Sequence, residues 1–243
     1  MHDTDPILTL SGVHTHIGEY HILQGVDLVV PRGGLSVLLG RNGAGKTTTL
    51  RTIMGLWKAS QGRITFAGND ITKTDTPQIA ALDIAYVPEN MGVFADLTVA
   101  ENIRLAARSG PPNTARLDWI FALFPALKKF WQLPAGVLSG GQKQMLSIAR
   151  AVIEPRALIL VDEPTKGIAP AIIENMIGAF RQLKQAQTTI LLVEQNFRFA
   201  AGLGDTVAVM DGGRVVHAGS MAALVGDTAL QSRLLGLSLA THQ

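Results

Sequence analysis

Gly40 and Gly45 are separated by four residues and are followed directly by Lys46 and Thr47, a spacing that suits phosphate chemistry. Glycines let a backbone curl so that successive amide N–H groups point at one anion. The ammonium of Lys46 can then reach the outer phosphates, and the hydroxyl of Thr47 can bind the magnesium that accompanies them. We therefore predict that residues 40–48 bind a nucleoside triphosphate.

Two adjacent carboxylates, Asp162 and Glu163, follow the apolar run of residues 157–161. Buried charges are unfavourable unless they meet a cation or a hydrogen-bonding partner, and the magnesium of a bound nucleotide is such a cation. We predict that Asp162 holds this ion, directly or through water, and that Glu163 accepts a proton from a water aimed at the γ-phosphate. The alternative, an exposed acidic turn, is disfavoured by the five apolar residues before it.

Ser139, Gly140, Gly141 and Gln142 form a third motif, with the glycines and the helix start of an anion site but no following Lys-Thr. A chain with two such loops and one phosphate-binding lysine is unusual. One explanation is that the second loop covers a nucleotide held by another subunit.

The elements around these motifs predict an α/β fold. A strand over residues 35–39 and a helix over residues 48–56 flank the first loop, which aims a helix N-terminus at the phosphates. Further strands alternate with helices such as residues 170–185, which predicts a parallel sheet covered on both faces. The other predicted strands are residues 7–13, 25–30, 63–66, 84–87, 157–161, 189–193, 206–210 and 214–217.

Turn-forming residues predict where these strands are interrupted. A connection is expected at residues 14–21, a break at 60–62, a turn at 67–70 and a hairpin turn at 211–213.

Helical periodicity replaces strands between about residues 97 and 135, with a connection at residues 109–112. Trp119 and Trp131 are expected to pack inside this helical region, although an aromatic recognition surface is the alternative. A further helix should follow Ser139, and the apolar tail of residues 220–239 should pack back on the domain.

The composition excludes several classes of protein. Of 243 residues, 47% are hydrophobic and 16% charged, which is unlike a disordered chain. The 21 basic and 19 acidic side chains give a net charge of +2, too small to indicate a polyanion-binding surface. The chain has no cysteine, a polar N-terminus and no run approaching the ~18 apolar residues of a membrane span. We therefore expect a soluble, cytoplasmic protein.

The three motifs, in this order and spacing, resemble those of the ATP-binding cassette (ABC) ATPases from residue 7 to about residue 219. The resemblance implies an α/β fold with a P-loop NTPase-type parallel sheet flanked by helices, an N-terminal antiparallel β subdomain and a small helical signature subdomain. It implies one domain over residues 1–243, with a core at about 1–95 and 155–243 and the helical part at about 96–154. It also implies an ATPase that uses ATP and Mg²⁺.

The resemblance assigns roles to particular residues. It implies that Lys46, Glu163 and Gln195 are catalytic, and that Thr47, Asp162 and Glu89 hold the magnesium ion. It implies that the signature Ser139, Gly140, Gly141 and Gln142 binds the ATP of a partner subunit. The implied nucleotide-binding residues are Gly40, Arg41, Asn42, Gly43, Ala44, Gly45, Lys46, Thr47 and Thr48, with Ile17 at the usual adenine-stacking position and Tyr20 as its possible substitute.

Three departures from the common family pattern indicate a subfamily. Glu89 replaces the usual Gln, Gln195 replaces the usual switch His, and residues 165–170 read Thr-Lys-Gly-Ile-Ala-Pro rather than Ser-Ala-Leu-Asp. Gln195 can donate a hydrogen bond to a γ-phosphate but cannot carry a proton as histidine does, so hydrolysis should depend on Glu163. These departures resemble the second ATPase subunit of branched-chain amino acid importers; the ATPases of urea and short-chain amide importers are similar.

The resemblance also implies partners. It implies a second ABC ATPase subunit, either a copy of this chain or a sibling, two transmembrane permease subunits and, indirectly, an external substrate-binding protein. Nucleic acid is not expected as a partner. The protein would then lie on the inner face of the cell membrane, held there by the permease.

Two alternatives from other classes remain at this point. A soluble ABC module acting in translation or DNA metabolism would usually carry two cassettes or a long coiled-coil insertion, and this chain has neither. A partner that binds ATP but no longer hydrolyses it would be indicated by loss of Lys46, Asp162 or Glu163, and all three are present.

Overall fold

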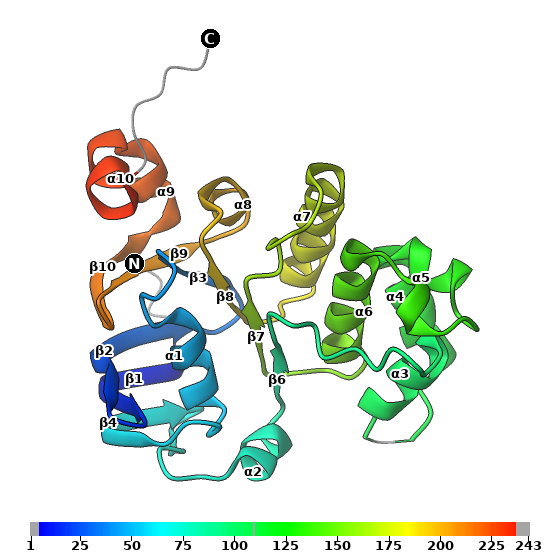
Figure 1. The fold of residues 1–243 in the computed structure, drawn as a ribbon, viewed down its shortest axis with the longest axis horizontal. Helices are drawn as coiled ribbons and strands as arrows, with labels where there is room; N and C mark the ends of the chain where they lie inside the picture. The colour runs from blue at the N-terminus through cyan, green and yellow to red at the C-terminus, as the bar shows by residue number, and fades with distance from the viewer. Residues whose placement is uncertain (1–4, 109, 237–243) are drawn as a thin grey trace.

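The computed structural model describes residues 5–108 and 110–236, whose strands form two β-sheets surrounded by helices (Figure 1). One sheet is antiparallel around β1 and has the strand order β2-β1-β4-β5. Its strands are β1 (Pro6–Ile17), β2 (Tyr20–Pro31), β4 (Ala59–Phe66) and β5 (Asn69–Asp70). The predicted N-terminal antiparallel part is therefore confirmed.

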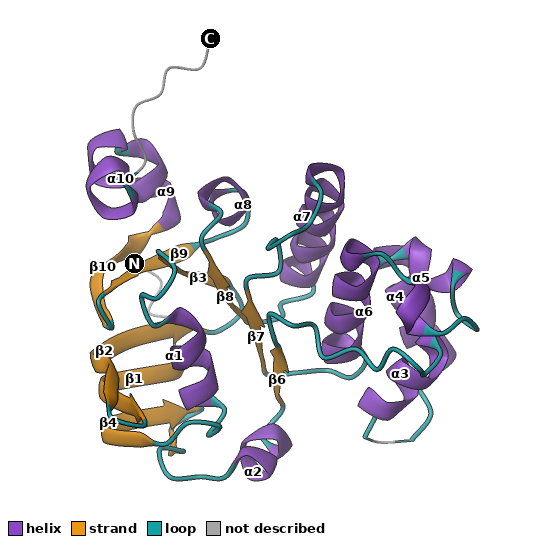
Figure 2. Ribbon diagram, viewed as in Figure 1, coloured by secondary structure: helices purple, strands orange, loops and turns teal. Residues whose placement is uncertain are grey.

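The second sheet has the order β10-β9-β3-β8-β7-β6 and runs through the centre of the molecule (Figure 2). Its pairs are parallel except for β10 against β9. The strands are β3 (Leu35–Gly40), β6 (Ile84–Val87), β7 (Leu158–Asp162), β8 (Ile190–Glu194), β9 (Thr206–Asp211) and β10 (Arg214–Ser220). The predicted parallel sheet is confirmed, with one antiparallel strand at its edge.

Helices lie against both faces of this sheet and form a group at one end of the molecule (Figure 2). The α-helices are α1 (Lys46–Ile53), α2 (Thr76–Ala81), α3 (Val99–Ala106), α4 (Thr114–Leu123), α5 (Pro125–Lys129), α6 (Gly140–Val152), α7 (Pro170–Gln185), α8 (Phe197–Ala201), α9 (Met221–Gly226) and α10 (Thr228–Leu235). A short 3₁₀ turn, Ala135–Val137, precedes α6. The group consists of α3 to α6, as the helical periodicity of that region predicts.

Alternate residues of the central strands point into two separate hydrophobic clusters. Leu35, Val37 and Leu39 of β3 belong to a cluster with α3, α4, α6 and α7, whereas Leu38 belongs to one with α1, β1 and β2. Because successive side chains of a strand point to opposite faces, a sheet covered on both faces needs continuous apolar strands. This is why the strand before the phosphate loop has no polar alternation.

Two of the predicted interruptions in the first sheet are wrong. Residues 14–21 are not a loose connection: β1 and β2 continue to a tight turn at Gly18, where φ is +58°. The predicted break at residues 60–62 lies inside β4, where a Cβ on Gly62 would come within 2.2 Å of the carbonyl oxygen of Gly12. Gly62 therefore marks a close approach between strands rather than the end of one.

Two smaller differences concern α1 and the turn after β4. The helix begins at Lys46, two residues before the predicted start, and ends at Ile53, so Thr47 and Thr48 lie in its first turn. Within the predicted turn at residues 67–70, Asn69 and Asp70 pair with β4 as the short strand β5.

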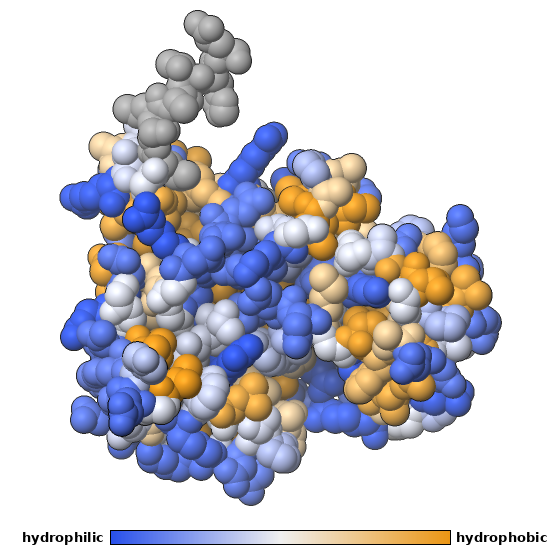
Figure 3. Space-filling model, in the orientation of Figure 1, coloured by the Kyte–Doolittle hydropathy of each residue, from blue (hydrophilic) through white to orange (hydrophobic). Residues whose placement is uncertain are grey.

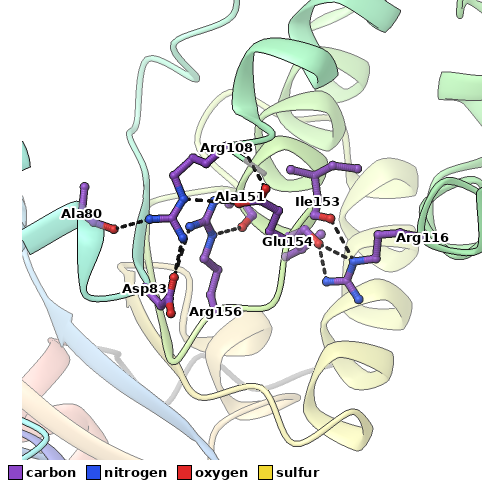
Figure 4. A network of polar contacts seen from close by, with 9 residues as sticks. Ala80, Asp83, Arg108, Arg116, Ala151, Ile153, Glu154 and Arg156 are labelled. Atoms are coloured by element: carbon purple, nitrogen blue, oxygen red, sulfur yellow. Dashed lines mark hydrogen bonds and ion pairs between the residues drawn. The ribbon is translucent and has the colours of Figure 1, made fainter. Parts of the chain in front are cut away.

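Polar contacts join the helical group to the central sheet (Figure 4). Arg108, just after α3, donates to the carbonyl oxygen of Ala80 and pairs with Asp83 before β6 and with Glu154 after α6. Arg116 of α4 donates to the carbonyl oxygen of Val152 at the end of α6. Arginine thus satisfies helix-terminal carbonyls that would otherwise lack a partner.

The aromatic side chains of the helical group are packed, as predicted. Phe124 is buried, and Phe121 meets Trp131 edge to face with ring centroids 5.1 Å apart. Trp119 lies against the same cluster.

The predicted tail of residues 220–239 is described as far as residue 236 and packs back through α9 and α10; residues 237–239 lie outside the described part. Of the predicted connection at 109–112, Ser109 also lies outside it. Among the residues that the structure describes, no helix is both long and apolar enough to cross a membrane.

Candidate phosphate-binding site

The loop between β3 and α1 owes its shape to glycine. Gly43 and Gly45 have φ of +80° and +107°, values that side chains with a Cβ rarely adopt. A Cβ on Gly45 would lie 3.0 Å from Cδ2 of Leu23 and 3.1 Å from Cε of Met210, so the loop is also tightly backed. The loop leads directly into the N-terminus of α1, where backbone N–H groups are free to face an anion.

Lys46 is buried and has three oxygen partners. Its Nζ donates to the carbonyl oxygens of Gly40 at 2.9 Å and Arg41 at 3.1 Å, and lies 2.9 Å from Oε1 of Glu163. The ammonium group is thereby held between its own loop and the loop that follows β7. A phosphate that accepts from Lys46 would compete with Glu163 for the same ammonium.

Thr47 and Tyr86 both donate to Asp162. The Oγ1 of Thr47 lies 3.0 Å from Oδ1 and the hydroxyl of Tyr86 lies 3.1 Å from Oδ2. Burial, partly offset by these two hydrogen bonds, raises the pKa of Asp162. Burial and the neighbouring Asp162 raise the pKa of Tyr86 as well, so this hydroxyl stays protonated and keeps donating.

Glu163 is held in an unusual backbone conformation at the end of β7. Its φ is +43°, and its N–H donates to the carbonyl oxygen of Val193 at 2.9 Å. Positive φ in a residue other than glycine is uncommon and often found at functional sites. While Oε1 faces Lys46, Oε2 is buried without a hydrogen-bond partner. This carboxylate therefore has acceptor capacity left for a water or a ligand.

Glu89, after β6, and Lys166, after β7, form an ion pair of 2.6 Å beside these residues. The Nζ of Lys166 also lies 4.0 Å from Oε2 of Glu163. Sequence reasoning named Glu89 but not Lys166, since nothing in the motif spacing shows that the two side chains meet. A cavity of about 380 Å³ is lined by Ile22, Asn42, Gly43, Gly45, Lys46, Thr47, Thr48, Glu89, Glu163 and Lys166.

The structure places Ile17 and Tyr20 at the turn between β1 and β2, outside the residues that line this cavity. Tyr20 is 76% exposed. The apolar residue that does line it is Ile22, which sequence reasoning did not name. Ile22 and the buried Leu23 beside it on β2 are adjacent apolar residues, and no predicted strand included them.

Gln195 is exposed beside the end of β8, but the preceding residue is the one that organises this turn. Glu194 is buried and accepts from the N–H and hydroxyl of Thr165 and from the N–H groups of Gln195 and Asn196. Burial, opposed by these hydrogen bonds, raises the pKa of Glu194. Glu194 thus ties the loop after β7 to the loop after β8, a role that sequence reasoning missed.

The Ser139 motif lies at the start of α6 and contributes no residue to the cavity lining. Ser139 caps the helix by accepting from the N–H of Gln142, whose side chain accepts from the N–H of Ser139 in return. Gly141 is buried against α7: a Cβ there would lie 2.6 Å from Cγ2 of Ile172. Ser139 and Gly140 are exposed, so the helix N-terminus faces outward.

The oxygen atoms around the cavity suit a hard cation only in part. In the described residues, no group of three or more His, Cys, Asp or Glu side chains is arranged to hold a metal ion. Mg²⁺ is usually bound by one or two carboxylates together with phosphate oxygens and water. Thr47, which lines the cavity, and Asp162, which accepts from it, fit such a shared site.

The surface in Figure 3 carries hydrophilic side chains across the middle of this face, with hydrophobic patches over the helical group. The central region lies over the ends of β3, β7 and β8 in the same view as Figure 1. A polar surface at the carboxyl ends of parallel strands is where α/β proteins bind ligands.

Comparison with known proteins places these features in a family. Residues 23–166 match the family model described as ABC transporter. The chain is 36% identical over 232 residues to the high-affinity branched-chain amino acid transport ATP-binding protein BraG of Pseudomonas aeruginosa, covering 95% of this chain and 100% of that protein. It is 34% identical to a probable branched-chain amino acid transport ATP-binding protein, LivF, of Archaeoglobus fulgidus, covering 90% and 94%. A methionine import ATP-binding protein of Rhizobium johnstonii is 32% identical, covering 90% and 62%.

Solved structures agree with this fold. An ATP-binding cassette of an ABC transporter in its ADP conformation superposes with a TM-score of 0.79 at 25% identity, covering 96% of this chain and 100% of that one. A bacterial Atm1-family exporter with ATP bound gives 0.83 at 23% identity, covering 97% and 42%.

Proposed function

The chain belongs to the ABC transporter family of ATP-binding proteins and is an ATPase, and from this premise we propose that it powers an importer of branched-chain amino acids. The names of two relatives that match nearly the whole chain support this substrate class. The observation that carries the ATPase part is that Lys46, Thr47 and Glu163 line one cavity while Thr47 donates to the buried Asp162 beside it.

The geometry supports a division of labour in hydrolysis. The N–H groups of residues 40–48 and the ammonium of Lys46 would bind the phosphates, in competition with Glu163 for that ammonium. Once released, Glu163 can accept a proton from the attacking water, a step in which Oε2 already has free acceptor capacity. Thr47 and Asp162 would hold Mg²⁺, which neutralises charge on the phosphate oxygens. Gln195 can donate a hydrogen bond to the γ-phosphate.

Ser139 and Gly140 support a two-subunit site. They are exposed at the start of α6 and do not line the cavity that holds Lys46. Their N–H groups would cover the nucleotide bound by a second ABC ATPase subunit, as a helix N-terminus can do for a phosphate. We propose that the paired subunits act on two permease subunits, which would hold this chain at the inner face of the membrane. Glu89, paired with Lys166, would join the magnesium site only if that ion pair opened.

Two measurements test this function. Purification of the tagged chain should recover a second ATPase subunit and permease subunits, and the complex should hydrolyse ATP. A strain lacking the chain should lose most uptake of radiolabelled leucine while it keeps uptake of methionine and urea. Recovery of a permease with loss of methionine or urea uptake instead would contradict the substrate class, and a purification without any permease would contradict the transport role.

A further inference from the structure

Lys166 is the second lysine at the phosphate cavity, and no role above uses it. It follows β7 by only a few residues and lines the same cavity as Lys46 and Thr47. The two ammonium groups lie on either side of one carboxylate: Lys46 is 2.9 Å from Oε1 of Glu163, and Lys166 is 4.0 Å from Oε2. Lys166 is therefore close to where the reacting end of a nucleotide would lie.

The cavity lining has mixed chemistry. Ile22 supplies an apolar contact, while Glu89, Glu163 and Lys166 supply charged groups. The loop N–H groups bind the phosphates nearest the loop, and Lys46 reaches the outer phosphates. A terminal phosphate extends furthest from the loop, toward the loops that follow β6 and β7, where Lys166 is a second lysine that can bind it.

The charged side chains around the cavity determine how the ammonium of Lys166 can act. Two carboxylates, Glu89 and Glu163, and two lysines line the cavity, so each ammonium is paired with a carboxylate that an anionic ligand must displace. Lys166 is 49% exposed at its side chain and Glu89 is 37% exposed. Their ion pair is thus accessible to solvent, where such pairs are weak and easily exchanged. A phosphate, which carries more charge than a carboxylate, can compete for Lys166.

We propose that Lys166 is a specificity-determining residue that favours nucleoside triphosphate over diphosphate, and that Glu89 pairs with this lysine until a triphosphate binds. The inference rests on the nucleotide site proposed above. Lys166 exchanges Glu89 for the terminal phosphate, while a diphosphate, which ends nearer the loop, does not reach it. Exchange also frees the carboxylate of Glu89.

The test is equilibrium binding of fluorescent ADP and of a fluorescent non-hydrolysable ATP analogue, with Mg²⁺, at protein concentrations at which sedimentation shows a monomer. Lys166→Gln should weaken triphosphate binding about 5- to 10-fold and change diphosphate binding less than about 2-fold, consistent with loss of one charge-assisted contact. Lys166→Arg should keep most of the preference. Glu89→Gln should increase the preference when binding is measured without Mg²⁺, because it releases Lys166 and no contact of Glu89 with the metal is lost.

Matched controls separate this inference from the site itself. Lys129→Gln removes the same charge from an exposed position on α5 and should leave both affinities unchanged. Lys46→Ala should weaken both nucleotides strongly; if it does not, the nucleotide site proposed above is wrong. If Lys46→Ala behaves as expected but Lys166→Gln weakens both nucleotides equally, or neither, only the role of Lys166 is overturned.

Discussion

Glu163 combines a backbone with positive φ and a buried carboxylate oxygen that has no hydrogen-bond partner. Its other carboxylate oxygen, Oε1, lies 2.9 Å from Nζ of Lys46. Such strained positions persist where the surrounding structure imposes them, and here the bond from its N–H to Val193 does so.

Glu163→Gln should slow ATP hydrolysis about 10²- to 10⁴-fold, the usual contribution of a general base. The amide keeps the shape of the side chain, so ATP should still bind with near-normal affinity. Steady-state phosphate release, measured beside equilibrium binding of labelled ATP, separates the two effects. Full ATPase activity in this variant would mean that another group activates the water.

The proximity of Lys46, Thr47 and Asp162 could be predicted, because the carboxyl ends of all the parallel strands, β3 and β7 among them, lie at the same edge of the sheet. The pairing of Glu89 with Lys166 could not, since it depends on the reach of two side chains from separate loops. Ile22 was missed for a different reason: the second strand was predicted to begin at residue 25, whereas β2 begins at Tyr20 and includes Ile22.

At the scale of the elements, α6 is a helix whose start is fixed from two sides. Ser139 and Gln142 cap it, and the lack of a side chain at Gly141 lets α7 approach through Ile172. The motif therefore has a packing role in addition to any contact with a nucleotide.

Gly141→Ala should destabilise the protein by about 1–3 kcal/mol, because a Cβ would lie 2.6 Å from Cγ2 of a stiff β-branched side chain. Gly140→Ala is the matched control: its Cβ would meet only Cδ1 of Ile168 at 3.9 Å, an ordinary contact. Urea unfolding midpoints of both variants measure the difference. Equal midpoints would show that α7 moves to accommodate the added Cβ without loss of stability.

The β1–β2 hairpin carries three stacked histidines. The ring of His21 lies 4.2 Å from that of His16 and 5.1 Å from that of His14, and Nε2 of His21 is 2.9 Å from Nδ1 of His14. Partial loss of hydration, followed by the charges of His16 and His14, lowers the pKa of His21 from its ordinary value of 6.5. The folded protein therefore favours neutral His21.

Stability should fall as the pH drops through about 6.5, because the unfolded chain then binds a proton that folded His21 resists. Above pH 7 His21 is neutral in both the folded and the unfolded chain, so it does not contribute to the pH dependence of stability. The loss of melting temperature between pH 7.5 and pH 5.5 should be smaller in His21→Gln than in the parent protein. His217→Gln, which removes a histidine from β10, should retain the parent's full loss; equal losses in all three proteins would exclude the stack as the cause.

On the scale of the whole molecule, the cavity and the outward-facing start of α6 are separate surfaces of one subunit. If each of these two surfaces completes a nucleotide site with a second subunit, the association of the two subunits should depend on bound nucleotide.

With ATP and Mg²⁺, the Glu163→Gln variant should sediment as a dimer, and the same protein without nucleotide as a monomer. Adding Lys46→Ala should restore the monomer, since the phosphates that join the two surfaces are no longer held. A dimer that persists in the double variant would contradict the two-subunit site.

The fold class and the alternation of strands and helices could be predicted because they follow from apolar periodicity and turn residues. The first sheet was the weaker part of the prediction. Gly18 and Gly62 are the same residue type, yet Gly18 lies in a hairpin turn, whereas Gly62 lies inside β4, close to the carbonyl oxygen of Gly12. Only long-range pairing separates these two uses of glycine, and local sequence does not contain it.

The position of β3 between β8 and β9 has a consequence for synthesis of the chain. Both neighbours of β3 are made long after it, and Gly213 then bonds to Ala44 through its N–H and to the N–H of Gln24 through its oxygen. At roughly 5–20 residues per second, translation from Lys46 to Gly213 takes on the order of 10–30 s. Until then the ribosome-bound chain has the residues of the phosphate loop but not the C-terminal strands that pack against it. A nascent chain should therefore begin to bind nucleotide late and in one step, as the last strands emerge.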